Sequence, residues 1–335
     1  MANRICVPPM VCYHFTDDSG YVVEKNINHY GSIAKGGFGL VIVEATAIDK
    51  SGRLSHDQLG LWEDGQIQGH SQIAACVHQE NVPVVVQIHH AGVMGCAEEV
   101  VSSSVCTVNN KTARALTLEE IETIESQFVA AAKRAEQAGY DGVEIHGAHN
   151  YLLTQFLNSR VNQRTDAYGE DKLLIVKNVI QKIRACTKDD FIVGIRMGAY
   201  EPTIDQGIAH AKVFESLGFD YLNVSFGFSF QMDDPTPADY EFSPHVYGAS
   251  QIAPHVNIPV FGVNQITNPA QAQAILTQGD LDMVCIGRGV LVNYNWANDA
   301  KANQDVGKCL YCPKCYWRIP MADCAGRRLY HKNKS

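Results

Sequence analysis

The stretch AEQAGYDGVEIHGAHNY, residues 135–151, joins the end of a predicted helix to a short strand and then to polar residues. Gly139 stands where a helix would end, because glycine readily adopts the left-handed conformation that commonly closes a helix. The mostly apolar run VEI predicts a buried strand, and His146, His149 and Tyr151 follow it directly. A single histidine in an apolar setting is usually a packing residue. Two histidines with a tyrosine at the end of a strand indicate a functional site.

The same succession of short apolar strand and helix recurs along the whole chain. Continuously apolar strands are typical of parallel sheets that are covered on both faces. Eight strands are predicted: RICVPP at 4–9, LVIVEA at 40–45, VPVVVQI at 82–88, VEI at 143–145, FIVGIR at 191–196, YLNVS at 221–225, IPVFG at 258–262 and DMVCIG at 282–287. Helices are predicted between them, among them 116–139, which opens with Thr117 and Glu120 in capping-box spacing. Eight strands alternating with helices predict a closed (β/α)8 TIM barrel, with an open doubly wound sheet as the alternative.

A dinucleotide-binding site of the Rossmann type is disfavoured. That site needs the pattern G-x-G-x-x-G directly after a strand. The two nearest matches, GGFG at 36–39 and GRG at 287–289, both lack the third glycine at the required offset.

Composition limits the class of protein further. The chain has 335 residues, of which 46% are hydrophobic and 19% charged, with a formal net charge of −9. This balance predicts a globular protein with a large core and disfavours nucleic acid as a partner. The sequence contains no apolar run long enough to span a membrane, and MANRICVPPM lacks the features of a signal peptide, so we expect a cytoplasmic protein. We further expect a barrel over residues 1–300, a cysteine-rich tail over 301–335, and a homo-oligomer.

Polar residues collect at the predicted carboxyl ends of the strands. In a (β/α)8 barrel these ends form one mouth, where active sites lie. The polar residues are Glu44, Gln87, His90, His146, His149 and Arg196, and Ala45 lies beside Glu44 at the same strand end. Gly262, Gly287 and Arg288 follow the last two strands, where barrels commonly bind phosphate, although glycine-dependent turns would also explain the two glycines.

Several stretches together resemble the old yellow enzyme family of FMN-dependent ene reductases, in particular the branch of the bacterial 2,4-dienoyl-CoA reductases and trimethylamine dehydrogenase. The resemblance covers about residues 3–295. It is carried by NRICVPPM, GLVIVEATAI, VVVQIHHAG, AEQAGYDGVEIHGAHNYLLTQFLNSRVNQRTDAYG, FGVNQIT and CIGRGVL. It implies bound FMN, NADH or NADPH as the reductant, and a small α,β-unsaturated carbonyl compound as the substrate. Both would react in turn at the same flavin, in a ping-pong scheme.

The resemblance also implies roles for individual residues. Around the flavin these are Pro8, Pro9, Met10 and Ala45 beside the ring, Gln87 at its pyrimidine edge, Arg196 near N1 and O2, and Gly262, Gly287 and Arg288 at the phosphate. His146 and His149 would donate hydrogen bonds to the substrate carbonyl, where negative charge develops during reduction. Tyr151 would donate a proton to the α-carbon. Tyr13 would assist in substrate binding.

The chain also departs from the family pattern. Val11 stands where many relatives carry a cysteine, and RTDAYGEDKLLIV, residues 164–176, lacks a segment usual in relatives. The tail spaces Cys309, Cys312, Cys315 and Cys324 as C-x2-C-x2-C-x8-C, which could hold a [4Fe–4S] cluster or zinc, or be a set of reduced thiols. Reduction of activated C=C bonds is the leading prediction. Oxidation of an amine, or a flavin-binding barrel that acts as a partner subunit without turnover, are the alternatives.

Overall fold

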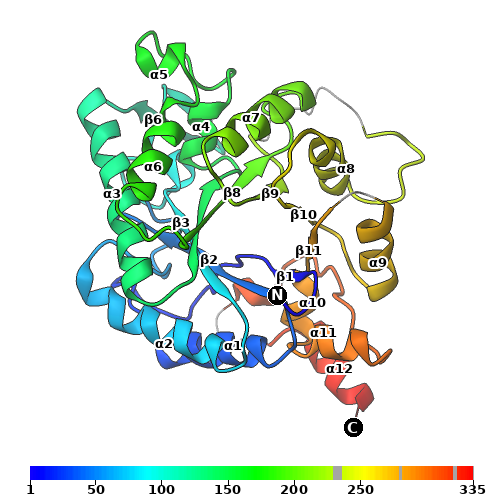
Figure 1. Ribbon diagram of the computed structural model, residues 1–335. Coiled ribbons are helices and arrows are strands. Elements are labelled where there is room, and N and C mark those ends of the chain that lie inside the picture. Colours follow the sequence, from blue (N-terminus) through cyan, green and yellow to red (C-terminus); the bar gives the residue numbers. More distant parts are fainter. Residues whose placement is uncertain (229–235, 279–280, 320–322, 335) are drawn as a thin grey trace.

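The protein forms a closed barrel of eight parallel strands, which confirms the predicted fold (Figure 1). The structure is a computed structural model that describes residues 1–228, 236–278, 281–319 and 323–334. Neighbouring strands follow the order β1-β11-β10-β9-β8-β7-β3-β2. Their bounds are β1 Ile5–Val7, β2 Leu40–Ala47, β3 Val84–His89, β7 Gly142–Gly147, β8 Ile192–Gly198, β9 Tyr221–Ser225, β10 Val260–Val263 and β11 Met283–Cys285. Each of the eight predicted strands corresponds to one of these.

The register of neighbouring strands places predicted site residues side by side. In the parallel pair of β3 and β7, Gln87 lies opposite Glu144, and in the pair of β7 and β8, His146 lies opposite Arg196. Every residue of β2, β3 and β7 is buried, because helices cover the outside of the barrel and side chains fill its interior. The polar residues at the strand ends are therefore held in a rigid, water-poor frame.

Helices surround the strands in Figure 1. Their bounds are α1 Glu24–Ala34, α2 Ile67–His78, α3 Leu118–Gln137, α4 Leu152–Leu157, α5 Ala167–Glu170, α6 Leu174–Arg184, α7 Ile204–Ser216, α8 Pro244–Ile252, α9 Pro269–Gln278, α10 Arg288–Val292, α11 Trp296–Lys301 and α12 Ala325–Lys334. Helix α3 begins as predicted, since the Thr117 hydroxyl accepts from the Glu120 N–H at 3.2 Å. Gly139 follows its end with φ of 87°. Over the part of the chain that the structure describes, no helix combines the length and apolar character of a membrane crossing.

A small sheet between β3 and α3 was not predicted. It consists of β4 Val101–Ser102, β5 Cys106–Val108 and β6 Lys111–Ala115, in the order β4-β6-β5. The turn between β5 and β6 is formed by Asn109 and Asn110, both with positive φ, which asparagine tolerates better than most residues. The strands are short and rich in serine and threonine, so hydrophobic periodicity gives little signal there.

The segment after α11 returns to the chain segment that follows β1. Trp317 donates from Nε1 to the Val11 carbonyl at 2.9 Å, and the Arg318 carbonyl lies 3.2 Å from Nε2 of His14. Helix α12 is held to α10 by Arg327, whose Nε donates to the Leu291 carbonyl at 2.9 Å. Residues close to the end of the chain are thus fixed beside its beginning.

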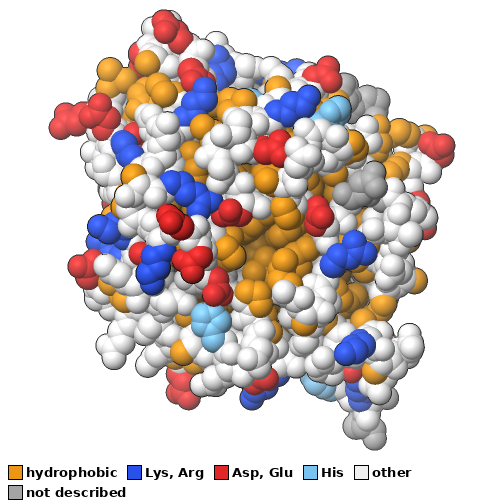
Figure 2. Space-filling model, in the orientation of Figure 1, with side chains coloured by type: hydrophobic (Ala, Val, Ile, Leu, Met, Phe, Trp, Pro, Cys, Tyr) orange, Lys and Arg blue, Asp and Glu red, His pale blue; other side chains and the backbone are white. Residues whose placement is uncertain are grey.

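Charges of both signs are interspersed on the face drawn in Figure 2, around a central hydrophobic area. Neighbouring opposite charges screen each other at a distance, so this mixture produces a weak field on that face.

Candidate functional site

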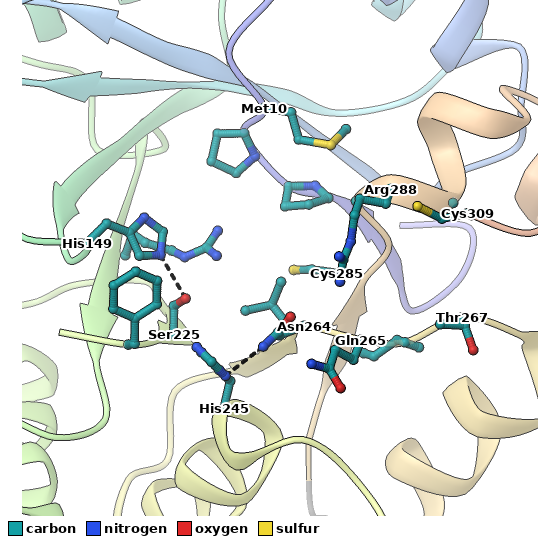
Figure 3. A pocket seen from close by; sticks show the side chains of 18 of the residues that line it. Met10, His149, Ser225, His245, Asn264, Gln265, Thr267, Cys285, Arg288 and Cys309 are labelled. Carbon is teal, nitrogen blue, oxygen red and sulfur yellow. Dashed lines mark hydrogen bonds between the residues drawn. The ribbon is translucent and has the colours of Figure 1, made fainter. Parts of the chain in front are cut away.

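A hollow of about 400 Å³ lies at the carboxyl ends of the strands. Its walls include Pro8 and Met10 after β1, Arg196 on β8, Asn264 after β10, and Arg288 at the start of α10. In Figure 3, His149 and Ser225 lie on one side of this hollow, and Arg288 and Cys309 on the other. Segments from opposite ends of the sequence therefore form one site at the mouth of the barrel, where such barrels carry their active sites.

Arg196 is the buried cation of this hollow. Its side chain comes from β8, only 5% of the residue is exposed, and Nε has no hydrogen-bond partner among the described residues. An unpaired buried donor costs about 1–3 kcal/mol, so such groups normally have a partner. The hollow thus presents a fixed N–H and a positive charge to whatever fills it, which suits a ligand with an acceptor atom that becomes negative.

His146, His149 and Tyr151 are brought together as predicted from their spacing. The ring centroid of His146 lies 5.0 Å from that of His149 and 4.8 Å from that of Tyr151. His149 and Asn150 have φ of 61° and 66°, and this left-handed turn brings the chain back over the end of β7. His149 and Tyr151 line two adjoining hollows, and His146 stacks edge-on against both rings.

Burial disfavours the charged form of both His146 and His149. Burial lowers the pKa of His146 well below its usual value, and the neighbouring His149, His89 and Arg196 add to the effect. Burial also lowers the pKa of His149, with Arg196 as the next cause. The Ala148 N–H donates to Nδ1 of His146 at 3.4 Å, which places the proton of the neutral ring on Nε2. Nε2 of His149 lies 2.8 Å from the Ser225 hydroxyl, which orients that ring.

Tyr151 keeps its proton, because burial raises the pKa of its hydroxyl above the usual value. It lines a second hollow of about 620 Å³ together with Tyr13. Pro9, Met10 and Arg288 line both hollows, so the two are adjacent. The predicted proton donor and the predicted substrate-binding tyrosine therefore lie beside the same space.

Sequence patterns did not single out His89, which belongs to the same cluster. Its ring lies 4.7 Å from Tyr151 and 5.6 Å from His146, and the residue is fully buried. Burial lowers its pKa to about 3, and neither ring nitrogen has a hydrogen-bond partner within the described ranges. A signal was present, because His89 stands two positions after Gln87 in a strand and so points to the same side as that residue.

Other predicted site residues lie away from the walls of the first hollow. Gln87 donates from Nε2 to Oε1 of Glu144 at 2.7 Å, and the Ala45 carbonyl accepts from Nε2 of Gln58 at 2.6 Å. Gly262 lies within β10, where an added Cβ would come within 2.5 Å of Cδ1 of Leu281. This contact is with the end of a flexible side chain, and the role of Gly262 at the phosphate stays a prediction. Its predicted neighbour at the phosphate, Gly287, does line the hollow.

Glu44 and His90 likewise have structural partners. The Glu44 carboxyl accepts from the Cys12 N–H at 2.7 Å and from the Tyr30 hydroxyl at 3.2 Å, and burial raises its pKa to about 7. Nδ1 of His90 accepts from the Gly92 N–H at 3.0 Å. Neither side chain is part of the hollow wall. The expectation that all the strand-end polar residues face one pocket is therefore too broad.

The four tail cysteines lie around three different hollows. Cys309 lines the first hollow, Cys312 and Cys315 the second, and Cys324 a third of about 430 Å³ on the other side of Trp317. Among the residues with described positions, no group of three or more His, Cys, Asp or Glu side chains is arranged to hold a metal ion. Metal binding by these cysteines stays a prediction.

Comparison with known proteins matches a family model over most of the chain. The model is described as the NADH:flavin oxidoreductase / NADH oxidase family and covers residues 1–306. An NADH oxidase from Thermoanaerobacter brockii is 35% identical over an alignment of 331 residues. The aligned region covers 92% of this chain and 50% of that protein. The chain therefore spans about half the length of this relative.

Two solved structures illustrate the likeness of fold. A 2-naphthoyl-CoA reductase in complex with 2-naphthoyl-CoA superposes with a TM-score of 0.86 at 21% identity, covering 96% of this chain and 54% of that one. The old yellow enzyme homologue from Zymomonas mobilis superposes with a TM-score of 0.78 at 25% identity, covering 95% and 96% of the two chains.

Proposed function

The chain belongs to the NADH:flavin oxidoreductase / NADH oxidase family, and from this premise we propose that it reduces activated C=C bonds of α,β-unsaturated carbonyl compounds. FMN would be the cofactor and NADH or NADPH the reductant. Residues 1–300 would form the flavin-binding unit and residues 301–335 a tail beside it. A homo-oligomeric state and a cytoplasmic location stay predictions.

The first hollow fits a flavin mononucleotide. Arg196 offers an unpaired buried N–H and a fixed cation, which would favour a reduced ring that carries negative charge. Gly287 and Arg288 would hold the phosphate, with the turn of Asn264 and Gln265 beside them, whose φ values are 91° and 56°. Bound FMN supplies the capacity to take a hydride from NADH or NADPH and to pass it to the second substrate.

The pair of buried neutral imidazoles is the observation that carries the proposal. His146 and His149 would each donate one N–H to the carbonyl oxygen of the substrate. Neutral rings donate without giving up a full proton, so they stabilise an oxygen that becomes negative during reduction of the C=C bond. Ser225 would hold the His149 ring in place through the 2.8 Å contact with Nε2. Tyr151 would then deliver its proton to the α-carbon.

A reduction assay tests the activity directly. The purified protein should be yellow, should bleach with NADH or NADPH under anaerobic conditions, and should regain its colour on addition of 2-cyclohexen-1-one. Bleaching by a methylated amine would instead favour amine oxidation, and failure to bleach with any reductant would favour a partner subunit without turnover. A colourless protein that does not take up FMN would contradict the proposal.

Replacement of both site histidines tests their role. The double variant His146→Ala/His149→Ala should stay yellow and should lose enone turnover by about 10²-fold or more, the scale of a lost oxyanion donor. The matched control is His56→Ala/His331→Ala, which removes two exposed histidines and should leave turnover unchanged. Enone kinetics in the first variant that equal those of the wild type would refute the role.

The tail cysteines are tested separately. If Cys309, Cys312, Cys315 and Cys324 hold a [4Fe–4S] cluster or zinc, metal analysis of anaerobically purified protein should give four irons or one zinc per chain. A Cys312→Ser variant should then lose the metal. Metal-free protein with full enone turnover would assign these residues as reduced thiols.

A further inference from the structure

Three cations line the second hollow without an opposing acid. They are Lys314 and Arg318 from the tail and Arg288 from α10, which would also hold the FMN phosphate. The residues that form the wall include no aspartate or glutamate. All three side chains are exposed, and none forms an ion pair with a carboxylate in the described part of the chain. This arrangement contrasts with the interspersed charges of the face in Figure 2. A hollow lined by charges of one sign attracts the opposite charge.

This hollow is also the one that contains the tyrosines of the site. Tyr13 and Tyr151 line it, and the Arg318 guanidinium lies 5.4 Å from the ring centroid of Tyr13. The Arg318 cation thus packs beside the ring of Tyr13, in the same hollow that Tyr151 lines. Arg288 lies 4.4 Å from the ring centroid of Tyr311, so it too is held by an aromatic ring of the tail.

The backbone around Arg318 is fixed, although its side chain is exposed. The preceding residue, Trp317, donates to the Val11 carbonyl at 2.9 Å and packs 5.5 Å from the ring of Phe15. The Arg318 carbonyl itself is engaged with His14 at 3.2 Å. Because these contacts hold the tail at the mouth of the barrel, less entropy is lost when a ligand binds to the cation.

We propose that the substrate carries an anionic group, a carboxylate or a phosphate, which Arg318 and Lys314 bind while its C=C bond lies at the flavin. This inference rests on the proposed function and narrows its substrate class. Arginine pairs with either anion through two parallel hydrogen bonds, whereas lysine contributes a point charge. Both residues lie in the tail, so the tail becomes part of the substrate site.

The reductant is also anionic, but the geometry favours the substrate. In NADH the diphosphate is separated from the nicotinamide by a whole ribose. Arg318 lies directly against Tyr13, next to the space where the reacting bond is expected. The acidic group of a small substrate in the second hollow would therefore meet this cation beside Tyr13.

Three substrates with the same ring make the test specific. They are 2-cyclohexen-1-one, 4-oxocyclohex-2-ene-1-carboxylate, and the phosphate monoester of 4-hydroxycyclohex-2-en-1-one. Each is assayed with the flavin-loaded wild type, with Arg318→Gln, with Lys314→Gln, and with the control Arg4→Gln. Arg4 is an exposed arginine that lines a different hollow, so the control loses the same charge elsewhere. The reductive half-reaction with NADH is measured separately for each protein.

We expect Arg318→Gln to raise KM about tenfold for one or both anionic compounds. Lys314→Gln should raise it less, and KM for cyclohexenone should stay unchanged in every variant. An effect on the carboxylate alone or on the phosphate alone supports the inference and identifies the group. Equal effects on the neutral and anionic compounds, or an effect on NADH reduction alone, would overturn it while leaving the proposed function intact. Failure of the wild type to reduce any of the three would overturn the proposed function itself, and this inference with it.

Discussion

His89 illustrates how a single residue can be unfavourable for stability and useful for function. The imidazole is fully buried, and no described residue bonds to either of its nitrogens. Burial without a partner costs about 1–3 kcal/mol, whereas leucine fills a similar volume without that cost. Residues that are strained or unpaired in the free protein tend to gather at binding sites, where a ligand supplies the missing contact.

We therefore expect His89→Leu to raise the free energy of unfolding by about 1 kcal/mol in the absence of substrate and to weaken enone binding. The measurements are denaturant unfolding and KM for cyclohexenone. The matched control is His70→Leu. His70 is equally buried, but its ring nitrogens lie 2.9 Å from the Tyr140 hydroxyl and 3.1 Å from the Gly60 carbonyl. His70→Leu should lower the free energy of unfolding, because it removes these hydrogen bonds. If His89→Leu lowers it as well, His89 is not an unsatisfied buried group.

At the scale of one element, helix α3 tests how local sequence stabilises the barrel. The Thr117 hydroxyl accepts from the Glu120 N–H, and the Glu120 carboxyl accepts from the Thr117 N–H at 2.8 Å. Loss of such a cap costs about 1 kcal/mol. Thr117→Ala should lower the free energy of unfolding by this amount. The control Thr123→Ala removes an exposed threonine from the middle of the same helix and should change it by less. Equal losses of unfolding free energy in the two variants would show that the capping hydrogen bonds add no stability beyond that of a threonine inside the helix.

The elements also show which parts of the fold could be predicted from the sequence. The barrel strands were predictable because their sequences are mostly apolar and nearly all their residues are buried, as in β2 and β3. The strands of the small sheet, such as β5, alternate weakly and are half-exposed, so their pairing depends on contacts that periodicity does not encode.

The same distinction applies to the site. His146, His149 and Arg196 could be placed because they directly follow or belong to strong strands. The place of the tail could not be predicted, since it depends on Trp317 and Val11, which are 306 positions apart in the sequence. A glycine after a strand, such as Gly262, gives the same sequence pattern whether its backbone approaches a ligand or its Cα packs against a neighbour such as Leu281, so the sequence alone does not separate the two roles.

For the molecule as a whole, the number of buried histidines determines how stability depends on pH. Burial is the main cause of a lowered pKa at His29, His70, His89, His90, His146, His149, His210 and His245. Below pH 6.5 the unfolded chain protonates these rings while the folded protein keeps them neutral. Each therefore removes about 1.4 kcal/mol of stability per pH unit between its unfolded and folded pKa.

Buried carboxyls act in the opposite direction but are fewer. Burial raises the pKa of Glu44 to about 7, that of Glu201 to about 8, and that of Glu144 above its usual value. Between pH 4.5 and its folded pKa, each of these carboxyls is protonated in the folded protein but ionised in the unfolded chain. Each therefore increases the free energy of unfolding as the pH falls. Among the described residues, these eight histidines outnumber the three carboxyls, so the net effect is a loss of stability from pH 6.5 downward.

Unfolding below pH 6.5 should consequently take up several protons. Because typical free energies of unfolding are only about 5–15 kcal/mol, we expect the protein to unfold at about pH 5. Thermal unfolding from pH 8 to pH 4.5 would show Tm falling steeply below pH 6.5, and calorimetry in buffers of different ionisation enthalpy would count the protons. His70→Leu should reduce that count by one, because it removes a buried histidine that lies outside the active site. A Tm that stays constant between pH 7 and pH 5 would mean that these rings titrate with the same pKa in the folded and the unfolded protein, and the lowered pKa values of His146 and His149 would then have to be abandoned.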